Sequence, residues 1–130
     1  MTMRDLVHNI KAVNAVAAAT RSASVDGDAV DLLGFDSVAL VVTTGAVTGA
    51  GNMTVKLQES DTTTAGDFTD VDPAHLQGAI ANPLVASTTT KLGYRGFKRY
   101  LRAVLTLNSG TSVTVGAVFL LGNAAERPVA

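Results

Sequence analysis

Acidic side chains gather in one short polar stretch and are the first candidates for chemistry. Four aspartates, Asp61, Asp67, Asp70 and Asp72, lie close together in the chain. Oxygen-rich loops in β-sandwiches can hold Ca²⁺. The spacing matches no EF-hand loop, however, and aspartate is common in turns because its side chain bonds to nearby backbone. We therefore expect no bound metal here and no cofactor elsewhere.

The side chains of covalent and acid–base catalysis are scarce. There is no cysteine, which excludes thiolate nucleophiles and Cys-ligated zinc. His8 and His75 stand alone, without a second histidine at the spacing of a metalloprotease helix. No serine lies in a Gly-x-Ser-x-Gly motif, and the glycine-rich run from Gly45 to Gly51 lacks the Lys-Ser/Thr of a phosphate-binding loop. This run is predicted to be a hairpin loop. We expect a protein with no catalytic residues that is not an enzyme.

A basic and aromatic segment is the strongest candidate for binding. Its charged members are Lys91, Arg95, Lys98, Arg99 and Arg102, and Tyr94, Phe97 and Tyr100 lie between them. One interpretation is a solvated face or a set of internal ion pairs with Asp or Glu. The other is a contact patch for acidic side chains of a partner, with arginine supplying directional pairing and the aromatic rings supplying anchors. The candidate interface residues are Arg95, Lys98, Tyr100 and Arg102. A net charge of −1 and a pI near 6.0 argue against nucleic acid as the partner.

A strand must position this segment. From Phe97 the side chains alternate, and Arg99 is expected toward the core side or at the strand's end. A period of two predicts a half-buried β-strand. The predicted core face is Phe97, Arg99, Leu101, Ala103, Leu105 and Leu107. Residues 108–111 form a turn in which Gly110 can adopt positive φ. The same core face then continues through Val113, Val115, Ala117, Phe119 and Leu121. The two segments are predicted to form a β-hairpin.

The remaining pattern predicts one all-β domain over residues 1–130. About eight short strands are separated by turn signals, which is typical of a two-sheet sandwich, and a jelly roll is the arrangement we expect. Residues 37–44 are β-branched and apolar, as in a central strand buried on both sides. Residues 3–19 fit both a helix and a strand, and we interpret residues 1–19 as a strand or an extended N-terminal arm.

Composition adds two expectations. No apolar run approaches the roughly 20 residues of a membrane helix, and the N-terminus lacks the order of a secretory signal. We therefore expect a soluble protein made in the cytosol, without a membrane partner. Only 16% of the residues are charged, which is low for the surface of a small monomeric domain. Either much of this surface is covered in use, or the chain has the Thr-rich strands that are ordinary in β proteins.

Two segments carry a family resemblance. Residues 55–61 with 65–71 (VKLQESD … AGDFTDV) and residues 93–102 (GYRGFKRYLR) resemble small proteins encoded beside the capsid genes of tailed bacteriophages, prophages and gene-transfer agents. Residues 3–11 and 117–122 are also similar to that group. The resemblance spans most of the chain, but residues 74–90 fit it poorly.

The resemblance implies a capsid cement (decoration) protein of jelly-roll type on an HK97-like shell. The implied place is the capsid surface of a virion assembled in a bacterial host, and the implied partners are the major capsid protein and further copies of this chain, as a homodimer or a homotrimer. The N-terminal arm, with Arg4 and Lys11, would be a second tie beside the basic–aromatic strand. The alternatives are a carbohydrate-binding or adhesion module, and a neck or tail-completion component of a phage particle.

Overall fold

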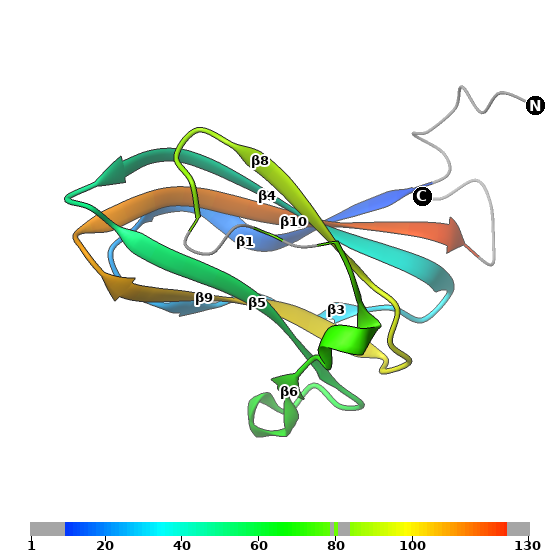
Figure 1. Ribbon diagram of the computed structural model, residues 1–130. Coiled ribbons are helices and arrows are strands. Elements are labelled where there is room, and N and C mark those ends of the chain that lie inside the picture. The colour runs from blue at the N-terminus through cyan, green and yellow to red at the C-terminus, as the bar shows by residue number, and fades with distance from the viewer. Residues whose placement is uncertain (1–9, 79, 81–83, 125–130) are drawn as a thin grey trace, which may run out of the picture.

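The computed structural model describes residues 10–78, 80 and 84–124 and shows two β-sheets packed face to face (Figure 1). The first sheet contains, in spatial order, β1 (Lys11–Arg21), β10 (Ser112–Ala124), β4 (Phe35–Thr48), β8 (Thr89–Tyr94) and β7 (Leu76–Gln77). The second contains β2 (Val25–Asp26), β9 (Tyr100–Ser109), β5 (Asn52–Ser60) and β6 (Thr69–Asp70), and β3 (Val30–Asp31) also pairs with β9. Two 3₁₀ turns, η1 (Ala65–Asp67) and η2 (Pro73–His75), lie between strands. No helix in the described part of the chain is long and apolar enough to cross a membrane.

The strands pair as one long hairpin that has been rolled up. The pairs β1–β10, β2–β9, β4–β8 and β5–β6 are nested, and all are antiparallel. Successive pairs alternate between the two sheets. This nesting is the jelly-roll arrangement, so the predicted all-β sandwich is confirmed. The described residues form ten strands where the sequence predicts about eight, because very short strands such as β2 and β7 leave no periodic pattern.

The core lies between the inward faces of the two sheets. Phe119, Leu101 and Leu105 are fully buried, as their alternation predicts. The β4 strand lies centrally between β10 and β8, as predicted. Only its inward side chains, such as Leu40 and Val42, are buried. Its outward Val41 is only half-buried. The prediction that this strand is buried on both faces is therefore wrong for the single chain.

The predicted hairpin between residues 97–107 and 113–121 is wrong. The β9 strand pairs with β5, β2 and β3, whereas β10 pairs with β1 and β4. The turn at Gly110, which does adopt positive φ (80°), therefore connects the two sheets at one end of the sandwich. The β4–β5 connection makes the same crossing beside it (Figure 1). It is also shorter than predicted, since Gly45 lies within β4. Side-chain alternation is identical for a hairpin and for such a corner, because both place the same residues in the core.

The N-terminal segment is a strand where the structure describes it. Strand β1 runs antiparallel to β10 with two register irregularities, between Asn14 and Val16 and between Val16 and Ala19. Ala15 and Val16 are buried. The strand interpretation is therefore confirmed from Lys11 onward, and residues 1–9 lie outside the described residues.

Candidate interaction site

Two exposed apolar side chains share one hollow at an end of the sandwich. Phe97 is 82% exposed and Leu33 is 70% exposed. They lie in the β8–β9 and β3–β4 connections, which reach the end of the molecule opposite the Gly110 corner (Figure 1). Both line a surface hollow of about 390 Å³, which also includes side chains of Phe35, Tyr94 and Arg99. These two exposed apolar groups make this end of the sandwich the candidate interaction surface.

The path of the backbone before Phe97 is set by the Tyr94 ring. A side chain at Gly96 would overlap the Tyr94 ring and hydroxyl, so only glycine lets the chain pass over the ring. The buried Tyr94 donates its hydroxyl to Glu59 Oε1 at 2.7 Å and accepts the Lys98 backbone N–H at 3.2 Å. This joins β8 of one sheet to β5 of the other. Burial, reinforced by the Glu59 carboxylate, raises the pKa of Tyr94, so the hydroxyl stays a donor.

The other side of the hollow is fixed by an ion pair between Arg99 and Asp31. Arg99 donates from Nε to Asp31 Oδ1 at 2.9 Å and from Nη2 to Oδ2 at 2.8 Å, the two-pronged geometry that arginine favours. The Arg99 hydrogen bond lowers the pKa of Asp31 to about 2. The Leu32 N–H also donates to the Arg99 carbonyl at 2.8 Å. The two loops that carry Leu33 and Phe97 are thus bound to each other.

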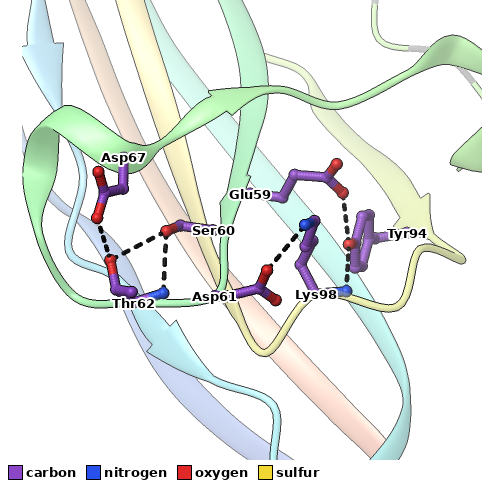
Figure 2. A network of polar contacts seen from close by, with 7 residues as sticks. All are labelled: Glu59, Ser60, Asp61, Thr62, Asp67, Tyr94 and Lys98. Carbon is purple, nitrogen blue, oxygen red and sulfur yellow. Dashed lines mark hydrogen bonds and ion pairs between the residues drawn. The ribbon is translucent and has the colours of Figure 1, made fainter.

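A histidine and a lysine flank the Phe97 ring without covering it. The His75 ring meets it edge-on with centroids 5.7 Å apart, and Lys98 Nζ lies 5.9 Å from its centroid. Lys98 Nζ also pairs with Asp61 at 2.8 Å (Figure 2), and this pairing raises the pKa of Lys98. The site is therefore an apolar anchor bordered by ion pairs, an arrangement suited to binding.

The four candidate residues of the basic–aromatic strand separate into two places. Lys98 belongs to the hollow. Arg95 is exposed and fixed through its backbone N–H, which donates to the His75 carbonyl at 2.7 Å. Tyr100 and Arg102 lie farther along, in β9, which begins at Tyr100. They are on the outer face of the second sheet, because the alternating Leu101 and Ala103 are buried.

Arg102 serves mainly the sheet itself. It donates twice to Gln58 Oε1 and lies 4.5 Å above the Phe68 ring centroid. Tyr100 is half-buried, with the Arg99 guanidinium 5.2 Å from its ring. The sequence left open whether the basic residues form internal ion pairs. Lys98 does so with Asp61, and Arg99 does so with Asp31.

Two expectations about aromatic positions are wrong. Phe97 is predicted on the core face, but it precedes β9 and is exposed. Arg99 also precedes β9 and is exposed, so it lies at the strand's end, which is one of the two places predicted for it. Tyr94, expected among the exposed anchors, is buried. Lys11 is exposed and begins β1, in a row that crosses the sheet through Leu121 and Val38 to Tyr94. It therefore lies at the same end as the hollow. Arg4 and His8 lie outside the described residues.

The aspartates of the acidic stretch each have a separate local task. Asp61 pairs with Lys98, and Asp67 accepts from the Thr62 hydroxyl at 2.7 Å. Asp72 caps η2 by accepting from the Ala74 N–H. Asp70 accepts from Gln58 Nε2 and pairs with Lys56 at 3.0 Å, contacts that lower its pKa. Within the described residues no three acidic or histidine side chains form a group that could hold a metal ion.

For three residues of the site, nothing in the sequence indicated their place in it. Leu33 lies in a turn between short strands, and the partners Asp31 and Glu59 are far in sequence from Arg99 and Tyr94. Only the rolled topology brings them together. Comparison with known proteins adds no relative, since no protein-family model and no curated protein matches the chain.

Proposed function

We propose that this protein is a structural cement protein that binds the outer surface of an HK97-like phage capsid and bridges neighbouring capsid subunits. The observation that carries the proposal is the Phe97–Leu33 hollow, an apolar anchor whose loops are held by hydrogen bonds and ion pairs. The resemblance of residues 55–71 and 93–102 to capsid-associated proteins supports the same assignment. Both resembling segments contribute to this end of the molecule, through Glu59, Asp61 and the β8–β9 connection.

The binding mechanism follows from how the anchor is held. The loops that carry Phe97 and Leu33 are held by the Tyr94–Glu59 and Arg99–Asp31 contacts, so little loop ordering opposes binding. An apolar side chain of the major capsid protein fills the hollow, and carboxylates beside it meet Arg95 and Lys98. Each contact is modest, but many copies on one shell act together with the shell's own subunit contacts.

The proposal is tested by mixing the purified protein with empty shells of the major capsid protein encoded in the same genome. We expect it to co-sediment with the shells and to appear by cryo-electron microscopy as ordered density over subunit boundaries, with the Phe97 end against the shell. A protein that never co-sediments with shells would overturn the assignment.

The copy number separates cement from the alternative of a neck or tail-completion component. A cement protein is present in hundreds of copies per particle, whereas a neck component is present in about a dozen or fewer. Quantitative mass spectrometry of purified particles gives this number, and a low value would transfer the protein to the neck or tail.

A further inference from the structure

The ring of His75 packs against the exposed Phe97 anchor. The two rings meet edge-on with their centroids 5.7 Å apart, an arrangement that aromatic pairs favour. Because Phe97 is 82% exposed, little else restrains the orientation of its ring. Lys98 Nζ, which lies 5.9 Å from the Phe97 centroid, is itself held by Asp61. His75 is therefore the aromatic support of the anchor.

The backbone of His75 is fixed on both sides. Its N–H donates to the Asp72 carbonyl at 2.8 Å, and its carbonyl accepts the Arg95 N–H at 2.7 Å. The first bond closes the η2 turn, and the second ties this turn to the β8–β9 connection two residues before Phe97. The fold thus sets where the His75 ring lies, and a change in the ring itself is felt directly at Phe97.

The Nδ1 atom of His75 is buried and has no hydrogen-bond partner in the described part of the chain. A neutral imidazole can keep its single proton on Nε2, which leaves Nδ1 as a lone pair. A protonated imidazole is a donor at both nitrogens. A buried donor without an acceptor is costly, and more so when it is charged. The observed position of the ring therefore suits the neutral form and not the protonated form.

The charged groups around this ring do not compensate a second proton. In the β8–β9 connection the neighbours are cations: Arg95, whose backbone contacts His75, and Lys98, which lies beside the same Phe97 ring. The carboxylates on the surrounding elements already have other partners: Asp72 accepts from the Ala74 N–H, Asp61 pairs with Lys98, and Glu59 accepts from the Tyr94 hydroxyl. A proton on Nδ1 would therefore add positive charge beside two cations and find no acceptor.

We propose that His75 is a pH-sensitive positioning residue for the Phe97 anchor. Neutral His75 holds the Phe97 ring in its binding orientation, whereas protonated His75 leaves its place and releases the ring. The proposal deepens the proposed function and rests on it for its use, because it regulates the same hollow. Histidine ordinarily changes charge between pH 5 and pH 8, so binding to the shell is strong near neutral pH and weaker in mild acid.

NMR of the free protein tests the contact without a shell. The His8→Gln variant leaves His75 as the single histidine, because the chain has two. We expect a nuclear Overhauser effect between the His75 and Phe97 rings at about pH 7.5 and its loss at about pH 5.5, as the His75 signals report protonation. Neither Asp31, whose pKa is lowered to about 2, nor Tyr94, whose pKa is raised, changes charge in this range. A cross-ring effect that persists at the lower pH would overturn the proposal.

Co-sedimentation with empty shells measures the effect on binding. The wild type should bind at least about threefold more weakly at pH 5.5 than at pH 7.5, because apparent affinity falls with the fraction of molecules that keep the binding conformation. His75→Phe retains an aromatic ring that cannot be protonated, so its affinity should be the same at both pH values. His8→Gln is the matched control and should keep the pH dependence of the wild type. A wild type without pH dependence, or an equal loss in His75→Phe, would overturn the proposal.

A second variant guards against a folding defect in His75→Phe. His75→Gln removes both the ring and the titrating group at this half-buried position. Its affinity should be independent of pH and close to that of the wild type at pH 5.5, since Phe97 has lost its aromatic support in both. A His75→Gln variant that keeps the pH dependence of the wild type would refute the role of His75.

The two kinds of measurement keep this proposal separate from the proposed function. If the cross-ring effect is lost in acid and no variant binds shells at any pH, the cement function fails and the role of His75 stands. If shells are bound equally at both pH values and the cross-ring effect persists, the cement function stands and the role of His75 is refuted.

Discussion

The side chains at the hollow form two groups, one exposed to solvent and one that holds the exposed group in place. Phe97 and Leu33 contribute little to the core because they are largely exposed. Tyr94, Arg99 and Asp31 hold them in place through hydrogen bonds that cross from loop to loop and from sheet to sheet. Substitutions in the first group should therefore change binding, and substitutions in the second group should change stability.

Phe97→Ala is expected to weaken binding to capsid shells at least about tenfold, because an aromatic side chain that becomes buried in an interface is commonly a hot spot. The free energy of unfolding should change by less than about 0.5 kcal/mol, as for other surface substitutions. Co-sedimentation and urea unfolding measure the two quantities. Val85→Ala is the control, since Val85 is also exposed (53%) but does not line the hollow. Equal shell binding by both variants would contradict the assignment of Phe97.

Tyr94→Phe is expected to destabilise the fold by about 1–3 kcal/mol, because the Glu59 carboxylate and the Lys98 N–H lose their shared partner. Glu59→Gln keeps an acceptor oxygen and should cost less. The pKa of Tyr94 is raised in the folded protein, so its stabilising contribution is present below the unfolded pKa of about 10 and is lost as pH rises above it. Urea midpoints measured from pH 8 to pH 11 should fall more for the wild type than for Tyr94→Phe. Parallel curves would show that the hydroxyl does not act in this way.

The Asp31–Arg99 pair predicts a response to acid. The folded pKa of Asp31 is lowered to about 2, so the pair stabilises the fold fully above the unfolded pKa of about 3.9 and loses this contribution as pH falls toward 2. Asp31→Asn should be less stable than the wild type at pH 7, and the difference should shrink between pH 4 and pH 2. The effect should be small because both side chains are nearly half exposed. Thermal melting at each pH gives the comparison, and a constant difference would refute the linkage.

At the scale of elements, the two connections that cross between the sheets are packed against each other. Gly110 has φ of 80°, and a side chain there would overlap the Ala50 carbonyl in the β4–β5 connection. This close approach holds the sandwich shut at the end opposite the hollow. The sequence predicts the positive φ of Gly110 as part of a hairpin turn. It does not predict that the β4–β5 connection lies so close that no side chain fits at this position.

Gly110→Ala should therefore destabilise the protein by about 2 kcal/mol or more, from backbone strain and steric overlap together. Gly66→Ala provides the matched control, since Gly66 has no positive φ and a side chain there would meet nothing within 4 Å. It should change the unfolding free energy by less than about 1 kcal/mol. Chemical denaturation of the three proteins measures the difference, and a tolerated Gly110→Ala would mean that the corner can open without cost.

At the scale of the whole molecule, the nested pairing joins the first described strand to the last, β1 to β10. Such pairing requires closure of nearly the entire chain before the contacts form. Refolding should accordingly be slow for a domain of this size, on the order of milliseconds to seconds. Stopped-flow dilution from denaturant measures it, and refolding in microseconds would contradict the nested order of strands.

The end of the sandwich and the outward faces of its two sheets differ in their surface chemistry. The hollow lies at one end of the sandwich. The outward side chains of β1, β10 and β4 are small and uncharged over most of their length, whereas the outward face of the second sheet carries Lys56, Asp70 and Arg102. The sequence gives only the average fraction of charged residues, 16%. The structure shows that the outward face of the first sheet has few of them.

The sequence alone determined the local properties of this protein. Alternation identified the core face of β9 and β10 from Leu101 to Leu121, β-branched composition identified β4 as central, and Gly110 was recognised as a turn residue. These properties depend on near neighbours in the chain and on the period of a strand, so one sequence is enough to read them.

Only the tertiary structure decided which strands are neighbours and which side chains meet. The same alternation fits a hairpin and an inter-sheet corner, so pairing of β9 with β5 rather than β10 could not be read. The alternating pattern places Phe97 in the core because it does not show that the strand begins only at Tyr100. Asp31 meets Arg99, and Glu59 meets Tyr94, across long stretches of chain. Contacts of this kind arise from how the sheets close on each other, which no local pattern encodes.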